Sequence, residues 1–419
     1  MEFLENVEIK DCEEIDSYTV NGCQKITKID VSNSSIKSFA ATNCNSLTSI
    51  NLSSCKRLTS FDVTNSDNIT TLNMSNNNSP VMNDLKLYTL YKLTDLNVSK
   101  STSLIRIRFP KYANVAEANK AQNGETGELW HNLRSLDLSN SSIKYIQYGS
   151  ADDDTNVCDM SQLTNLNKLI FNDCSSVVEI KNINYTDDKL NWKFSGDHSL
   201  TTISGTLNAN SDISGLFYEC RSLNNIDNLT FNFTNVTSCN SAMARCYSAT
   251  TTMLKKILNA CGTSLLFADS VANMYGSNPV IGSEKDTTRD MPNDLFANNP
   301  NLESLTGTFY NVKYTSIPGG LFNNNNKLKY LQSCFAGMDK LVSVGNDLIK
   351  NKPTLINVST LFANCFELVN YIDSDPQIFV GSPNITQTYE MFKDNVKLIN
   401  GVNGLNNMFA VLTKVTDIS

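Results

Sequence analysis

The sequence is poor in histidine, with only His131 and His198 among its 419 residues. A Ser-His-Asp or Cys-His arrangement would have to use one of them, yet each lies in a polar stretch without a nucleophile-elbow pattern nearby. There is also no CxxC, HExxH or Gly-rich phosphate loop, so the sequence does not support a metal or nucleotide site. We therefore predict surface histidines and a protein that is not an enzyme and needs no cofactor or metal.

Basic clusters and long apolar runs are also missing. The net charge is −8 with a pI near 5.0, and no cluster of Lys and Arg interrupts it. Because phosphate backbones are bound through a basic stripe, a nucleic-acid partner is not expected. Apolar runs such as 408–412 are far too short to cross a bilayer, and the acidic start, MEFLENVEIKDCEE, does not have the pattern of a signal peptide. We expect neither a transmembrane segment nor a signal peptide in the chain as given.

What the sequence does contain is an internal repeat. Residues 47–74 read LTSINLSSCKR, LTSFDVTNSDN, ITTLNM, and the same phrase recurs from about 26 to 180. Alternate apolar positions predict a short strand in each phrase, and the polar corner after it predicts a turn. Two phrases make about 22 residues, the length of one coil of a repeat solenoid. We interpret each coil as two phrases, with a strand on each or with a strand and an extended segment opposite.

The first repeat region is similar to a known family. The pieces SLTSINLSSCKRLTSFDVTNS and KLTDLNVSKSTSL resemble the leucine-rich repeats of Bacteroidetes surface proteins, and the resemblance covers most of residues 20–180. Two insertions break it: residues 110–132, with an Ala-rich piece expected to be helical, and the acidic loop 149–160. Asp152, Asp153 and Asp154, with Asp159, could gather a calcium ion. They lack the spacing of a dedicated calcium loop, so a solvated loop is favoured.

A second phrase begins at Asp212 with DISGLFYECRSLNNI and resembles the BspA-like leucine-rich repeat. The apolar residues of 251–275, three and four apart, predict a helix. From Met291 the repeat is regular, with intervals of 26, 27, 30 and 30 residues. One column of this repeat is Phe296, Phe322, Ile349, Phe379 and Phe409, and another is Phe309, Phe335, Phe362 and Phe392. We interpret the phenylalanines as a core ladder rather than as a ligand-stacking row.

These observations predict a leucine-rich-repeat solenoid, β-rich with short helical turns and with two repeat types in series. Residues 1–185 are expected to form leucine-rich repeats with 11-residue half-coils, and residues 186–290 an irregular transition with BspA-like units and a helical segment. Residues 291–419 are expected to form BspA-like repeats of 26–30 residues. The last repeat is cut, so we expect either a fragment or an uncapped C-terminal end that docks on a neighbouring chain.

Cysteine, at 12 of 419 residues, is too sparse to indicate a disulfide scaffold. Cys44, Cys55 and Cys174 each follow the third apolar position of a phrase by three residues. The other phrases carry small polar residues in this slot: Ser34, Ser66, Asn77, Ser101 and Ser141. In leucine-rich repeats such a slot points inward, so the resemblance implies small buried thiols. A bridge between neighbouring slots stays open, because the pairing cannot be deduced from the sequence.

The strand positions expected to face solvent are mostly small and polar, with two arginines, Arg106 and Arg108. Such a surface suits glycans or polar protein surfaces. Aromatic anchors contribute disproportionately to binding energy, so Trp130, Tyr145 and Tyr148, near the insertions, are further candidates for partner binding. The alternative for these aromatic residues is local packing of the loops on the solenoid.

The resemblance implies non-catalytic recognition by an adhesin-type module, extracellular or on a bacterial cell surface, with a protein or a glycan as its partner. Similar repeats also resemble segments of tail or fibre proteins of phages that infect gut Bacteroidetes, so a virion component is the alternative. A glycan-acting enzyme is the third possibility.

Overall fold

The computed structural model describes residues 4–79, 83–149, 157–275, 278–345, 347–371, 378–399 and 412–415. The chain divides into two compact units. Unit 1 comprises Met1–Thr186, Gly196–Leu207 and Asn228–Thr230, and unit 2 comprises Asp187–Ser195, Asn208–Asp227 and Phe231–Ser419. The Asp152–Asp154 run of the acidic loop and Phe409 lie outside the described residues.

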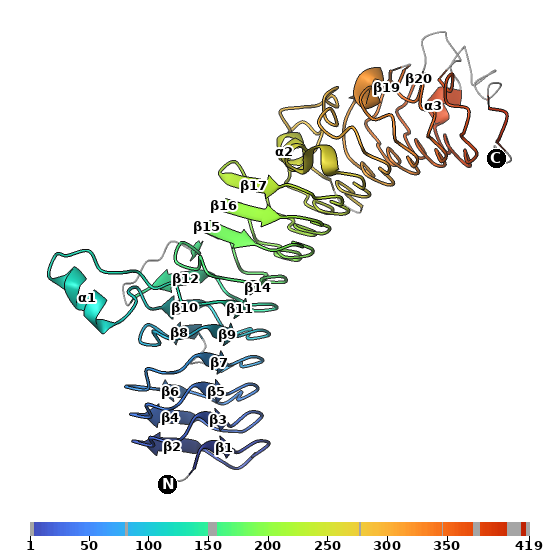
Figure 1. The fold of residues 1–419 in the computed structure, drawn as a ribbon. Coiled ribbons are helices and arrows are strands. Elements are labelled where there is room, and N and C mark those ends of the chain that lie inside the picture. The colour runs from blue at the N-terminus through green and yellow to red at the C-terminus, as the bar shows by residue number, and fades with distance from the viewer. Residues whose placement is uncertain are drawn as a thin grey trace. The chain divides into compact units, whose positions relative to one another are not determined.

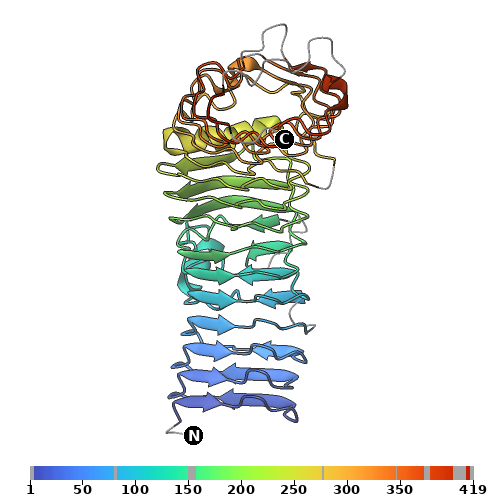
Figure 2. The ribbon, with the colours of Figure 1, turned by 90° about the vertical axis from the view of Figure 1, so that its right-hand side faces the viewer.

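Each coil of unit 1 carries strands on two sides, as the two-phrase interpretation predicts, and the strands of successive coils pair in parallel (Figures 1 and 2). One sheet contains β1 (Asn6–Glu8), β3 (Lys28–Asp30), β5 (Ser49–Asn51), β7 (Thr71–Asn73), β9 (Asp95–Asn97), β11 (Ser135–Asp137) and β14 (Lys168–Ile170). Ile29, Ile50, Leu72 and Leu96 pair in register and are buried. The same phrase position therefore stacks from coil to coil and forms the core.

The other side of the coils forms a second set of parallel strands. It contains β2 (Ser17–Asn21), β4 (Ser38–Thr42) and β6 (Ser60–Asp62), and then β8 (Asp84–Lys86), β10 (Arg106–Phe109), β12 (Tyr145–Tyr148), β13 (Val157–Asp159), β15 (Glu179–Thr186), β16 (Thr202–Ala209) and β17 (Leu229–Phe233). The strand β13 lies at the end of the stretch expected to be an acidic loop. It pairs with both neighbouring strands, so the loop is shorter than predicted.

The repeat is regular in space at β15 and β16, although its sequence period fades there. Asn182 in β15 has φ 57° and Gly205 in β16 has φ 120°. A β-carbon on Gly205 would lie 2.1 Å from the carbonyl oxygen of Ile183, so only glycine fits this close approach. These two residues interrupt the alternation of buried and exposed positions, as a β-bulge does, and so they hide the period in the sequence.

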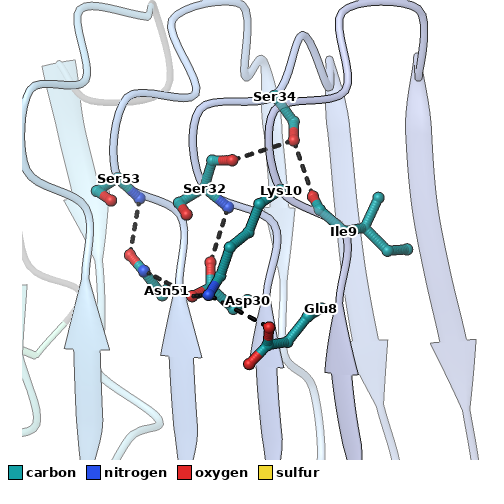
Figure 3. Close-up of polar contacts among 8 residues, drawn as sticks. All are labelled: Glu8, Ile9, Lys10, Asp30, Ser32, Ser34, Asn51 and Ser53. Atoms are coloured by element: carbon teal, nitrogen blue, oxygen red, sulfur yellow. Dashed lines mark hydrogen bonds and ion pairs between the residues drawn. The ribbon is translucent and has the colours of Figure 1, made fainter.

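The predicted slot points inward and links each coil to its neighbours. Ser66 donates from Oγ to the carbonyl oxygen of Ala41 at 2.7 Å and accepts from the Cys44 backbone N–H at 3.0 Å. Cys55 donates to Val31 at 3.1 Å, and Ser34 donates to Ile9 at 2.9 Å (Figure 3). The prediction of buried slot thiols is confirmed, because Cys44, Cys55 and Cys174 are fully buried. The structure describes all twelve cysteines, and none of them forms a disulfide.

Asparagine and aspartate close the corners at the strand ends. In Figure 3 the Asp30 carboxylate accepts from the Ser32 N–H at 3.0 Å, and Asn51 accepts from the Ser53 N–H at 3.1 Å. Asn51 also donates to Asp30 at 3.1 Å, which connects two coils through their side chains. Further along such corners a residue adopts the left-handed conformation, for example Asn33 with φ 54°, which asparagine tolerates better than most residues.

Unit 2 has shorter pairing than unit 1. A single residue in each coil forms a parallel bridge to the next: Lys189, Asp212, Ser238, Phe267, Ser304, Tyr330, Asn357 and Gln387. A side sheet contains β18 (Ser316–Ile317), β19 (Ser343–Val344) and β20 (Asn370–Tyr371). The remainder of each coil is mainly turns, and the 3-10 segments η2 (Gly262–Ser264) and η3 (Gly319–Phe322) lie in this unit. The bridges continue through residues 186–290, and the division into three repeat regions stays a prediction.

The phenylalanine columns of unit 2 form the predicted core ladder. Phe309, Phe335 and Phe362 are fully buried, and Phe392 is 8% exposed. The centroids of successive rings in this column lie 5.7, 5.6 and 5.7 Å apart, and the rings are stacked. The parallel column from Phe296 to Phe322 is also buried, with centroids 5.9 Å apart. Aromatic stacking thus adds to the aliphatic core of unit 2, where residues such as Leu328 and Leu355 are also fully buried.

Helices occur between coils. The insertion of unit 1 contains α1 (Val115–Gln122), as predicted, and Figure 1 shows it standing off the stack. The helix predicted over 251–275 is too long: α2 spans Thr251–Cys261 and continues only as η2 (Gly262–Ser264). Gly262, with φ 55°, ends it, and the following apolar residues form another coil with its bridge at Phe267. A short helix, α3 (Val396–Ile399), follows later, and no helix in the described ranges has the length and hydropathy to span a membrane.

Candidate functional site

Two of the predicted binding residues meet on the surface of unit 1. Arg106 on β10 and Tyr145 on β12 are paired in register, and the guanidinium carbon lies 4.6 Å from the centre of the tyrosine ring. Both side chains are half-buried. This geometry is a cation–π contact. The Arg106 guanidinium therefore covers part of one face of the Tyr145 ring. Their role in partner binding stays a prediction.

Arg108, two residues further along the same strand, is buried. It is 4% exposed, and its Nε donates to the two carboxylate oxygens of Asp84 at 2.8 and 3.1 Å. A charged group buried to this degree needs a partner of opposite charge, and Asp84 on the neighbouring strand β8 supplies it. Arg108 therefore links two coils through Asp84, and its predicted role in partner binding stays a prediction.

Trp130 and Tyr148 also point inward. The Trp130 indole is fully buried, stacks on Phe109 with ring centroids 5.2 Å apart, and donates from Nε1 to the carbonyl oxygen of Tyr91 at 2.8 Å. The Tyr148 hydroxyl donates to the carbonyl oxygen of Asp159 at 2.9 Å, and burial raises its pKa well above the usual value. Both rings contact Phe109, which is the kind of local packing that the sequence left as the alternative, and their role in partner binding stays a prediction.

The histidines are only partly at the surface. His131 and His198 are both half-buried, and the Nδ1 atom of His131 lies 3.0 Å from the Gln162 carbonyl oxygen. Among the described residues, no group of three or more His, Cys, Asp and Glu side chains gathers at a spacing suited to a metal ion.

A shallow hollow lies over the strands that open unit 1, with a volume of about 250 Å³. Three of its side chains, those of Glu8, Asp30 and Asn51, belong to one network of polar contacts that includes the adjacent Lys10. Lys10 bridges Glu8 and Asp30, with nitrogen–oxygen distances of 3.3 Å to each (Figure 3). Burial of Asp30 works against ionisation, but hydrogen bonds from Ser32, Asn51 and Lys10 lower its pKa overall. This surface is therefore a self-paired polar lattice.

Unit 2 contains a different kind of surface, which the sequence analysis did not predict. A hollow of about 320 Å³ opens over its turns, and we name it the aromatic groove. The residues on which its chemistry depends are Tyr218, Ala244, Arg245, Asn273, Tyr275 and Tyr310. Tyr310 also lines a neighbouring hollow of about 490 Å³ that extends to Lys313, Asp339 and Phe366. The two hollows lie along the same series of coils, and Tyr310 lines both of them.

Local contacts hold the aromatic side chains of this groove in place. Tyr275 is 61% exposed, and its backbone N–H donates to the Asn273 side-chain oxygen at 3.1 Å. Its carbonyl oxygen accepts from the Tyr247 hydroxyl at 3.3 Å, and its ring lies 5.9 Å from that of Tyr310, tilted by 34°. An exposed ring is thus positioned by hydrogen bonds on both sides of its own backbone.

At the other end of the groove, Tyr218 lies between Trp192 and Arg245. Its ring meets the edge of the Trp192 indole at 5.1 Å and an interplanar angle of 70°, and the Arg245 guanidinium carbon lies 5.7 Å from its centroid. Arg245 donates to Glu219 at 2.5 Å, and Arg221 donates to the other oxygen of Glu219 at 3.0 Å. Burial raises the pKa of Tyr218, and the bond to Glu219 raises that of Arg245, so near neutral pH the phenol is neutral and the guanidinium charged.

The sequence signal for this groove was present but concealed. Tyr218 directly follows the buried Phe217, and Tyr310 directly follows the ladder residue Phe309, so each reads as part of a core phrase. Trp192 lies in the stretch where the period fades. The signal that would have identified the two tyrosines is a second aromatic residue directly after a buried phenylalanine, as in Phe217–Tyr218 and Phe309–Tyr310.

Comparison with known proteins finds no matching family model and no matching curated protein sequence. The chain is similar to the structure of a leucine-rich-repeat protein from Leptospira interrogans, at 13% identity and TM-score 0.31, covering 93% of this chain and 89% of that one. It is also similar to a leucine-rich-repeat protein from Bacteroides ovatus, at 13% identity and TM-score 0.30, with coverage of 95% and 84%.

A further similarity is to the leucine-rich-repeat ectodomain of a plant membrane receptor kinase from Arabidopsis thaliana in complex with Casparian strip integrity factor 2. The identity is 12% and the TM-score 0.25, covering 90% of this chain and 50% of that one. The fold itself is established by the stacked parallel coils, the inward slot and the in-register aliphatic core of this chain. They define a leucine-rich-repeat solenoid.

Proposed function

We propose that this protein is a non-catalytic recognition module and that the aromatic groove of unit 2 is its contact surface. The observation that supports this most strongly is the exposure of large aromatic rings on ordered backbone: Tyr275 is 61% and Trp192 47% exposed. Aromatic residues in this situation supply large contact area with few rotatable bonds, which is why they dominate binding energy at interfaces.

The charged groups beside the groove support binding rather than proton transfer. Glu219 is held by ion pairs to Arg221 and Arg245 at 3.0 and 2.5 Å, and Lys313 in the neighbouring hollow is paired with Asp339 at 2.9 Å. Groups engaged in such pairs are orienting and hydrogen-bonding elements, whereas a general acid or base must exchange its proton with a substrate. The proposed partner is a protein or a glycan outside the cell.

The setting of this recognition is proposed from the repeat resemblance: an adhesin-type module displayed on a bacterial surface. The alternative, a tail or fibre component of a phage virion, predicts a different assembly. A mass measurement by size-exclusion chromatography with light scattering separates them. A monomer supports the surface module, and a trimer or larger ring supports the virion component.

The contact surface is tested with a combined protein and glycan array probed with the intact chain. The variant Tyr275→Ala should reduce the signal of the bound partner at least tenfold. Tyr330→Ala is the matched control, because Tyr330 is 41% exposed in the same unit but lines neither hollow. Equal loss in both variants, or none in either, would show that the aromatic groove is not the contact surface.

A further inference from the structure

We propose that the ligand of the aromatic groove is an oligosaccharide, whose sugar rings lie along the coils between Tyr218 and the pair Tyr275 and Tyr310. This inference rests on the proposed function and specifies its ligand class. It begins with the order of side chains along the groove. The position that follows the inward residue of the turn is Tyr218, Ala244, Asn273 and Tyr310 in four successive coils.

These four positions form a straight row. The backbone N–H of Glu219 donates to Ala244, that of Arg245 to Asn273 and that of Met274 to Tyr310, at 2.9, 2.8 and 2.9 Å. Backbone paired in this way advances by about 4.8 Å per coil, which puts Tyr218 and Tyr310 about 14 Å apart. A phenol therefore stands at each end of the row, with a short side chain and an amide between them. The hollow between them, about 320 Å³ in volume, has room for a short chain of sugar rings.

The chemistry of the lining fits the two surfaces of a sugar. A pyranose ring has a face of C–H groups, which packs on the electron-rich face of an aromatic ring, and a rim of hydroxyl groups, which need hydrogen-bond partners. The tyrosine rings provide faces for the C–H groups. Asn273 provides hydrogen-bond donors for the hydroxyl groups, because its oxygen accepts from the Tyr275 N–H and its amide nitrogen carries the donors. That nitrogen lies over Gly307, 3.8 Å from where a β-carbon would be. Ser241, Ser270 and Arg245 add hydroxyl and guanidinium groups.

The groove is less suited to a peptide. Binding of an extended peptide as an added strand requires free backbone N–H and carbonyl groups at a sheet edge. Along this row those groups are already paired from coil to coil, as for Arg245 with Asn273 at 2.8 Å. Binding of an amphipathic helix requires an apolar groove, whereas the side chains here are phenol, amide, hydroxyl and guanidinium apart from Ala244.

Trp192 indicates that the aromatic row is maintained at some cost. Its φ is 54°, a left-handed conformation that is unfavourable for a bulky side chain, and the equivalent positions of the next coils hold Gly215, Ser241 and Ser270. The indole lies across Gly215, where a β-carbon would come within 2.3 Å of the ring. Smaller residues occupy the same left-handed conformation in the next coils, so the indole adds an exposed aromatic surface beside Tyr218 that the backbone itself does not require.

The same tryptophan provides the measurement. The chain has two tryptophans, and Trp130 is fully buried, so quenching by acrylamide reports on Trp192. The intact chain is screened against an array of gluco-, manno-, galacto-, N-acetylhexosamine and sialyl oligosaccharides beside a protein array. Bound oligosaccharides are then titrated with fluorescence. We expect protection of Trp192 from acrylamide and a dissociation constant that rises at least tenfold in Tyr275→Ala.

A second variant separates ligand chemistry from structure. Asn273→Asp keeps the oxygen that accepts from the Tyr275 N–H and removes the amide donors, so it should weaken the oligosaccharide at least fivefold while Tyr330→Ala leaves its affinity unchanged. If a protein is bound instead, and Tyr275→Ala abolishes its binding while no oligosaccharide is retained, the sugar assignment is overturned and the proposed function stands. If the bound partner is insensitive to the groove variants, or no oligosaccharide on the array binds with a dissociation constant that rises in Tyr275→Ala, the groove is not a sugar site.

Discussion

Unit 1 and unit 2 stack parallel coils in different ways, and this difference decides which unit has a hollow lined by large aromatic side chains. In unit 1 each coil meets the next over three-residue or longer strands, with small polar side chains that bond to one another, as Asn51 does to Asp30. In unit 2 one bridging residue per coil is followed by a turn, and the turn carries large side chains such as Tyr218 and Tyr310.

The comparison shows that a strand and a turn use the same coil differently. A strand alternates strictly between inside and outside, so half of its residues form the flat polar lattice. A turn changes direction at residues with positive φ, such as Gly215 and Glu219, and so presents side chains of neighbouring positions at different angles. A hollow can then form between them. The predictions below test this contrast, beginning with the core on which each unit depends.

The largest expected effect is in the aromatic ladder. Phe335 is fully buried and its ring contacts those of Phe309, Phe322 and Phe362. Phe335→Ala should lower the free energy of unfolding by about 3–5 kcal/mol, because it removes apolar burial and leaves a cavity. Urea denaturation followed by circular dichroism measures this. Phe335→Leu, which refills most of the volume, should lower the free energy of unfolding clearly less. A loss below about 1 kcal/mol for Phe335→Ala would contradict a stabilising role of this ladder.

The two arginines that sequence and structure single out should behave in opposite ways. Arg108 in unit 1 is 4% exposed and bonded to Asp84, so Arg108→Ala should lower the unfolding free energy by about 1.5–3 kcal/mol. The Arg245 side chain in unit 2 is 37% exposed, so Arg245→Ala should cost less than about 1 kcal/mol. Denaturation curves of both variants, with Arg108→Lys as the control that keeps the charge, check the order. Equal costs would remove the distinction between a structural and a surface arginine.

A third test compares the slot in the two units. Asp197 in unit 1 is fully buried and accepts from the Cys174 N–H at 2.7 Å, whereas Asn395 holds the equivalent place in unit 2 and accepts from Cys365 at 2.8 Å. Burial raises the pKa of Asp197 well above its usual value. Asp197→Asn places in unit 1 the side chain that unit 2 has at this position. The amide can still accept from the Cys174 N–H, and it has N–H donors but no proton that titrates.

The sign of the pH effect follows from the raised pKa. Below about pH 4 the carboxyl is protonated in both the folded and the unfolded chain, and its contribution to stability is complete. As the pH rises, the unfolded chain loses this proton first, so the contribution declines until the pH has passed the folded pKa. The Asp197→Asn variant should therefore unfold at a higher temperature than the native sequence at pH 7 and at a similar temperature near pH 4. Thermal melts at both values measure this, and an equal difference at both would exclude a titrating Asp197.

The sequence predicted those features that rest on periodicity. Repeating positions identified the aliphatic core, the inward slot of Cys55 and Ser66 and the ladder of Phe335, because each coil places the same position in the same environment. Contacts across insertions were out of its reach. Trp130 is buried against Phe109 and bonded to Tyr91, residues that no local pattern connects to it.

The candidate site was largely missed for a related reason. The aromatic groove depends on the angle between turn positions in four coils, and that angle is set by backbone conformation at residues such as Gly215. Strand alternation predicts which strand residues face outward, such as Arg106, but it gives no information on turns. It also could not show that Asp84 on the next coil would neutralise Arg108.

The smallest change in stability is expected for two tyrosine substitutions, one in each candidate surface, which allow the two surfaces to be compared. Tyr145→Ala in unit 1 removes the ring beneath Arg106, and Tyr275→Ala in unit 2 removes an exposed ring of the aromatic groove. The Tyr275 variant should stay within about 0.5 kcal/mol of the native protein, since its side chain is mostly in solvent, and the Tyr145 variant within about 1 kcal/mol. Partner binding should nevertheless fall only in Tyr275→Ala. Loss of binding in Tyr145→Ala alone would move the contact surface to the strands of unit 1, because the two changes remove the same ring from folded proteins of nearly equal stability.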